Sequence, residues 1–127
     1  MPPNPGPGTP LDWLRRAKSN LVRAKQPKPE EVLWEDLCFD TKQAAKKAIK
    51  AVLVSKGISF RFVHDITEFL ALLENHGFIL PEEIKASAEL TDYAVESRYP
   101  GPFEPITEEE FKGALSIAEA VLTWADS

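Results

Sequence analysis

Residues 36–51 read DLCFDTKQAAKKAIKA, and this stretch decides the fold because no glycine or proline interrupts it. The apolar residues of the stretch and its flanks recur at helical spacing and form one inner face: Leu33, Leu37, Ala44, Ala48 and Val52. Upstream, Glu30 and Glu31 suit the positive end of a helix dipole, and downstream Gly57 suits a helix end. The sequence therefore predicts one long helix over residues 30–56.

One helix is predicted before the long helix and a shorter one after it. Thr9 has the position of an N-cap with Pro10 as the first helical residue, and apolar residues continue at helical spacing to about residue 26. After the long helix, Asp65 has the position of an N-cap, and Glu68 three residues later completes a capping-box pattern.

The C-terminal part predicts two more helices. Pro81 opens a fourth helix that runs to about residue 98, and Thr107 with Glu110 forms a capping box at the start of the last helix. No two-residue alternation bounded by turn residues indicates a hairpin. The predicted fold is all-α, an up-and-down antiparallel bundle of four main helices plus one short helix.

The composition is that of one globular domain. The chain has 127 residues, 43% of them hydrophobic and 28% charged, which suffices for one core. Residues 1–8 are rich in proline and glycine and predict a flexible tail, so that residues 9–127 form a single domain. The chain has no apolar run long enough to cross a bilayer, no secretory signal pattern and one cysteine, Cys38. We therefore expect a cytoplasmic protein without membrane contact.

The formal net charge of −5 is divided unevenly along the chain. Residues 1–61 hold 12 Lys and Arg against 6 Asp and Glu, whereas residues 62–127 hold 3 Lys and Arg against 14 Asp and Glu. Such a division is typical of a basic surface for nucleic acid or for a protein partner. It also arises when two oppositely charged halves pack against each other.

A row of lysines lies within the long predicted helix. Lys42, Lys46 and Lys50 recur at i, i+4 and i+8 and therefore share one helix face. Such a row can follow phosphates or dock an acidic partner. No aromatic residue interleaves the row, which favours the alternative of a solvated face or of pairing with the acidic helices that follow.

Residues suited to phosphate or base recognition form two clusters in the sequence. Arg61, His64 and Asp65 lie in the segment that enters the third predicted helix, and Arg98 and Tyr99 lie at the end of the fourth. Consecutive helices with short connections usually run antiparallel, which would bring both clusters to one end of the bundle. A histidine, an arginine and a tyrosine together there would form a pocket for a phosphate or a base.

Several common functional motifs are absent from the sequence. It contains no phosphate-binding glycine loop and no zinc signature. His64 and Glu68 share a helix face, but two candidate ligands without a third make a weak metal site. We expect neither a metal nor a cofactor.

Four elements of the sequence, in order, resemble those of the HEPN (higher eukaryotes and prokaryotes nucleotide-binding) domain family. They are residues 36–51, His64-Asp65-Ile66 with the apolar helix after it, Arg98-Tyr99-Pro100, and residues 118–124. The resemblance spans about residues 9 to 126 and implies a small helical bundle that commonly dimerises.

The resemblance also implies a function. Many family members are ribonucleases or toxins with an Arg followed four to six residues later by His, whereas here Arg61 precedes His64 by three positions. Other members pair with a minimal nucleotidyltransferase. The resemblance thus implies a non-catalytic or weakly catalytic homodimer that binds nucleotide or RNA and acts with such a partner, in a two-component or toxin–antitoxin pair.

Two alternative functions follow from the same residues. The first is a metal-independent ribonuclease in which His64 transfers protons and Arg61 or Arg98 stabilises the phosphate in the transition state. The second is a purely structural interaction module that docks an acidic partner on Lys42, Lys46 and Lys50.

Overall fold

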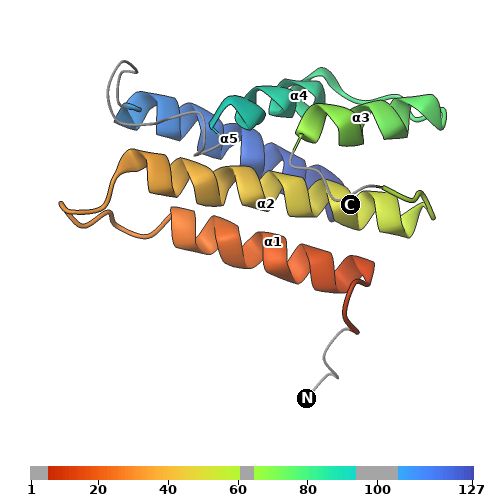
Figure 1. The fold of residues 1–127 in the computed structure, drawn as a ribbon, viewed down its shortest axis with the longest axis horizontal. Helices are drawn as coiled ribbons and strands as arrows, with labels where there is room; N and C mark the ends of the chain where they lie inside the picture. The colour runs from red at the N-terminus through yellow and green to blue at the C-terminus, as the bar shows by residue number, and fades with distance from the viewer. Residues whose placement is uncertain (1–5, 61–64, 94–105) are drawn as a thin grey trace.

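The computed structural model describes residues 6–60, 65–93 and 106–127. All regular structure in these ranges is helical, which confirms the predicted all-α class (Figure 1). The elements are α1 (Pro10–Ala24), α2 (Trp34–Ser55), α3 (Ile66–Asn75), α4 (Glu82–Lys85), the 3₁₀ helix η1 (Ala86–Tyr93) and α5 (Glu108–Ala125). None of the helices in these ranges is long and apolar enough to cross a membrane.

Helix α2 is the central element of the bundle. It contacts α1, α3, η1 and α5, and Figure 1 shows it between α1 on one side and α3 and α4 on the other. Because neighbours surround it, 13 of its 22 residues are buried, among them Cys38. A helix enclosed in this way buries polar side chains along with its apolar ones.

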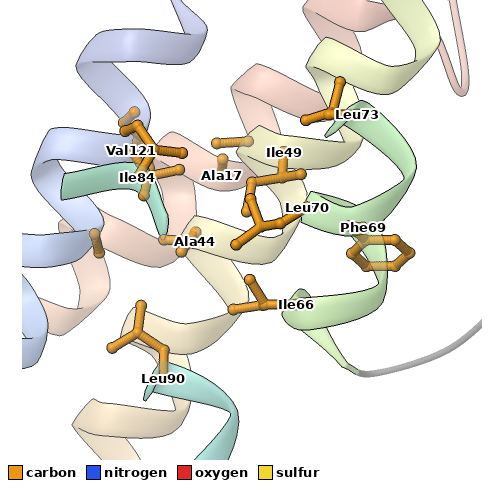
Figure 2. Packing of buried hydrophobic residues seen from close by; sticks show 14 of the residues in the cluster. Ala17, Ala44, Ile49, Ile66, Phe69, Leu70, Leu73, Ile84, Leu90 and Val121 are labelled. Carbon is orange, nitrogen blue, oxygen red and sulfur yellow. The ribbon is translucent and has the colours of Figure 1, made fainter. Parts of the chain in front are cut away.

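Small residues let the other helices approach α2 closely. Five alanines from α1, α2 and α5 are fully buried in the main core: Ala17, Ala44, Ala45, Ala48 and Ala118. Larger side chains fill the space between α2 and α3, where Figure 2 shows Ile49 facing Leu70 and Leu73. The main cluster therefore reaches every long helix, and a second, smaller cluster contains Ala24, Leu37, Cys38, Ile106 and Phe111.

The predicted N-caps of three helices are confirmed. The Thr9 hydroxyl accepts a hydrogen bond from the Asp12 N–H at the start of α1, at 3.2 Å. The Asp65 carboxylate accepts one from the Thr67 N–H at the start of α3, at 2.9 Å. At the start of α5, Thr107 and Glu110 form a complete capping box. Each bond satisfies a backbone donor that the helix leaves unpaired.

Asp12 ties the residues before α1 to the helix and responds to acid. Its carboxylate accepts hydrogen bonds from Arg15 at 2.7 Å, from the Gly8 N–H at 3.0 Å and from Arg16 at 3.1 Å. The Arg15 bond, followed by those from Gly8 and Arg16, lowers the pKa of Asp12 from 3.8 to about 2. The ionised form is thus favoured in the folded protein.

We expect Asp12→Asn to remove a stabilisation that depends on pH. Because the folded pKa of about 2 lies below the ordinary 3.8, the contribution is complete above pH 3.8 and is lost as the pH falls through about 2. Urea unfolding should give the wild type a higher free energy of unfolding than Asp12→Asn at neutral pH. The difference between the two proteins should disappear as the pH falls through this range. A difference that does not change with pH would contradict the assignment.

The beginning of α2 differs from the prediction. The helix starts at Trp34, because Leu33 is its extended N-cap residue, with φ −92° and ψ 149°. The Val32 N–H donates to the Pro29 carbonyl at 3.1 Å, so the chain turns here before the helix begins. The helix thus starts four residues later than the predicted position 30.

The predicted fourth helix also differs. In place of a continuous α-helix to about residue 98, the described part has the short α4 followed by η1, and residues 94–98 lie outside the described ranges. The buried hydroxyl of Ser87 donates to the Ile84 carbonyl at 2.6 Å. This bond occupies a carbonyl that a continuing α-helix would use, which favours the tighter turn.

The two oppositely charged parts of the chain contact each other where α1 packs against α5. Lys18 pairs with Asp126 at 3.2 Å, and Lys25 pairs with Glu119 at 3.7 Å. All four side chains are about half exposed, so the pairs add little to stability. They show that part of the uneven charge is compensated within the bundle.

Candidate functional site

Of the residues predicted to form the phosphate or base pocket, Asp65 lies in the described part of the chain. Arg61, His64, Arg98 and Tyr99 lie outside the described residues. The described neighbours of the first cluster are Phe60, which directly precedes Arg61, and Asp65, which directly follows His64. The local surroundings of Phe60 and Asp65 therefore define what the structure shows of the site.

The lysine row of α2 is buried. The exposed fractions of Lys42, Lys46 and Lys50 are 2%, 3% and 7%. The expectation that this row is a solvated face or an exposed docking stripe is therefore wrong, because α2 is enclosed by its neighbours. The long aliphatic stems of lysine make such burial tolerable when the ammonium group finds favourable surroundings.

Aromatic rings from several elements surround the end of the Lys50 side chain. The Lys50 Nζ lies 4.8 Å from the ring centroid of Trp13 in α1, 5.7 Å from that of Phe60 and 5.6 Å from that of Phe69 in α3. The Phe60 and Phe69 rings meet edge to face with centroids 5.6 Å apart. Each ring face attracts a cation, so the three rings stabilise the buried ammonium group.

Desolvation changes the ionisation of Lys50 and of Lys47 next to it. Burial lowers the pKa of Lys50, and the charge of Lys47 lowers it further. Burial also lowers the pKa of Lys47, with contributions from Arg16 and Arg23, whereas Asp40 raises it. Both ammonium groups thus lose a proton more readily than that of an exposed lysine.

A polar network joins α1 to α2 beside these lysines. The Asp40 carboxylate accepts hydrogen bonds from Asn20 at 3.0 Å and from Arg23 at 2.9 Å. The side-chain amide oxygen of Asn20 (Oδ1) in turn accepts a hydrogen bond from the Lys47 Nζ at 2.7 Å. The network holds Lys47 in place, and with it the charged neighbour of Lys50.

A shallow hollow adjoins the same segment. It has a volume of about 450 Å³ and is lined by Ser59, Phe60, Glu68 and Leu72. Phe60 belongs both to this hollow and to the ring cluster around Lys50, so an aromatic wall lies next to a buried cation. Among residues 6–60, 65–93 and 106–127, no group of three or more His, Cys, Asp or Glu side chains is placed to hold a metal ion.

Comparisons with known proteins agree with this architecture. The HEPN domain model matches residues 11–127. The crystal structure of TT1696 from Thermus thermophilus is similar, with a TM-score of 0.77 and 28% identity over 94% of this chain and 97% of that chain. ST0689, an archaeal HEPN homologue, has a TM-score of 0.73 and 26% identity over 93% and 95% of the two chains. No curated protein matches the chain.

Proposed function

Because this chain belongs to the HEPN domain family, we propose that it is a homodimer that binds nucleotides or RNA and acts with a minimal nucleotidyltransferase partner. The observation that carries the proposal is the match of the HEPN model over residues 11–127, which includes every described helix except the first residue of α1. HEPN domains commonly dimerise, which supports the homodimer.

The surroundings of Phe60 support an anionic ligand. Lys50 is held against the ring of Phe60, and Lys47 lies close enough to lower its pKa. Charges inside a protein are screened less than charges in water, so these cations act on a ligand at the neighbouring segment. The hollow beside Phe60 offers an aromatic wall for a base.

We assign roles to the candidate residues by their chemistry. Arg98 binds a phosphate through its planar guanidinium, and Tyr99 stacks on a base or donates a hydrogen bond. His64 changes its charge near neutral pH and so adjusts the affinity. Asp65 fixes the start of α3 next to His64 through its bond to the Thr67 N–H.

The proposal predicts that Arg98→Ala weakens the binding of labelled ATP and of short single-stranded RNA about tenfold, the loss expected for one charged hydrogen-bonding group. Fluorescence polarisation at low salt measures both affinities. Lys85→Ala is the matched control, because Lys85 is exposed and pairs with Glu74 and Glu82 on the surface, and it should bind like the wild type. No binding by the wild type up to millimolar ligand would refute the proposed function.

The other parts of the proposal are tested separately. Analytical ultracentrifugation should give twice the protomer mass, and a nucleotidyltransferase encoded next to this chain should co-purify with it. RNA cleavage in EDTA that disappears in His64→Ala would instead identify a ribonuclease.

A further inference from the structure

A cavity at one end of the bundle lies apart from the candidate site. Its volume is about 350 Å³, and it is lined by the start of α1, the ends of α2, α3 and α5, and the connection that holds Phe78, Ile79 and Leu80. Figure 1 shows the start of α1 and the ends of α2 and α5 together at the right-hand end of the bundle. The volume is within the range of cavities that bind small molecules.

The cavity has an apolar wall and one cation. Leu14, Val52, Phe78 and Trp124 supply aliphatic and aromatic surface. Lys56 is the only side chain with a full charge among the described lining residues, and none of them is Asp or Glu. The described side chains of the wall thus carry one positive charge and no negative charge, which favours a negatively charged ligand.

The charge of Lys56 is available to a ligand. Its Nζ lies 5.4 Å from the ring centroid of Phe78, and in the described part of the chain it forms no ion pair. The side chain is exposed, so the ammonium group is reached from solvent. The ammonium group thus lies beside the Phe78 ring at the cavity wall. It can bind an anionic group there and retain its contact with Phe78.

Backbone bonds close the helix ends around the cavity. In the last turns of α2 and α3, the Leu53 carbonyl accepts a closing bond from the Ile58 N–H at 2.9 Å, and the Leu73 carbonyl accepts one from the Phe78 N–H at 3.1 Å. Gly57 and Gly77 make these closures possible with φ of +71° and +89°. Lys56 is the C-cap residue of α2, so its positive charge offsets the negative end of that helix dipole and gives the cavity its one charged side chain among the described lining residues.

Ile79 extends the apolar surface to the rim of the cavity. Its side chain is 96% exposed, the largest exposed fraction among the described large hydrophobic residues. A ligand whose apolar body projects from the cavity would cover part of this side chain and remove it from water.

We propose that this cavity binds a small amphipathic anion, with an aromatic or branched aliphatic body between Trp124 and Phe78 and a carboxylate against Lys56. The proposal is independent of the nucleotide or RNA site, because none of the described residues that line the cavity also lines the hollow at Phe60.

The test uses 2-naphthoate as the anion and 2-naphthylmethanol as its neutral analogue. The wild type should bind the anion more tightly, and Lys56→Gln should weaken naphthoate binding about tenfold while the neutral analogue binds as before. Calorimetry measures the affinities, and ¹H–¹⁵N spectra should shift at Ser55, Phe78 and the Trp124 indole. Lys18→Gln, which removes an exposed lysine outside this cavity, is the matched control and should leave both affinities unchanged.

A second variant tests the cavity without changing charge. Ala125 lines it, and Ala125→Leu should fill part of the space and weaken both ligands, with the circular dichroism spectrum of the native protein retained. No naphthoate binding by the wild type, equal affinities of the wild type and Lys56→Gln, or spectral shifts elsewhere would each overturn the proposal.

Discussion

Replacing Phe69 with alanine is expected to lower the free energy of unfolding by about 3–5 kcal/mol. The side chain is 0% exposed, packs edge to face on Phe60 with ring centroids 5.6 Å apart, and lies under the Lys50 ammonium group. Its removal leaves a cavity between α2 and α3 and takes away one of the three rings that stabilise a buried cation. For a domain stable by about 5–15 kcal/mol, this is a large fraction of the total.

Phe39→Ala is the matched control for Phe69→Ala. Phe39 is 36% exposed, and its ring lies 5.1 Å from the Nζ of buried Lys42, so the same chemical change removes a similar cation contact but little buried area and should cost about 1–2 kcal/mol. Urea unfolding followed by circular dichroism gives both values. Equal losses of unfolding free energy in the two variants would show that Phe69 does not stabilise the contact between α2 and α3.

Replacing Asp40 with alanine is expected to cost about 2–3 kcal/mol. The carboxylate is nearly buried and accepts hydrogen bonds from Asn20 at 3.0 Å and Arg23 at 2.9 Å. Without it, the buried amide of Asn20 loses its acceptor, whereas the exposed guanidinium of Arg23 is hydrated by water. Most of the cost therefore comes from Asn20 and from the space that Asp40 occupied.

Two controls separate this network from a general effect of charge. Asp36→Ala removes an exposed carboxylate from the first turn of the same helix and should cost less than about 1 kcal/mol. Asp40→Asn retains an acceptor oxygen and should give an intermediate loss.

The Asp40 charge raises the pKa of Lys47, so that pKa should fall in Asp40→Ala, as measured by NMR titration. A loss no greater than that of Asp36→Ala would show that the network does not stabilise the contact of α1 with α2.

The predictions from sequence that are confirmed depend on local interactions. Thr9, Asp65 and Thr107 act as N-caps because each cap bond joins residues that are at most three apart in the chain. The predicted start of α2 at residue 30 was wrong because acidic residues such as Glu30 and Glu31 are compatible with a turn as well as with the first turn of a helix. The prediction of one continuous α-helix from Pro81 was wrong because the bond of Ser87 to Ile84 depends on a buried hydroxyl.

The burial of the lysine row illustrates what local patterns do not contain. The spacing of Lys42, Lys46 and Lys50 was interpreted correctly as one helix face. The surroundings of Lys50 depend on Trp13 in α1 and Phe69 in α3, which are distant in the sequence and meet Lys50 only in the folded bundle. Lys42, by contrast, lies against Phe39 of its own helix. The absence of aromatic residues between the lysines therefore led to the wrong expectation of a solvated face. The roles of His64, Arg98 and Tyr99 remain proposals, since these residues lie outside the described ranges.

The central position of α2 has a consequence for digestion by trypsin, which cuts after lysine and arginine. The peptide bonds after Lys42, Lys46 and Lys50 lie in an enclosed helix, so trypsin reaches them only when the bundle opens. The bond after Lys25, at the exposed end of α1, has no such protection. Digestion of the native chain should therefore begin at exposed sites such as those after Lys25 and Lys56, and the rate of cutting after Lys42, Lys46 and Lys50 would report the opening of the bundle.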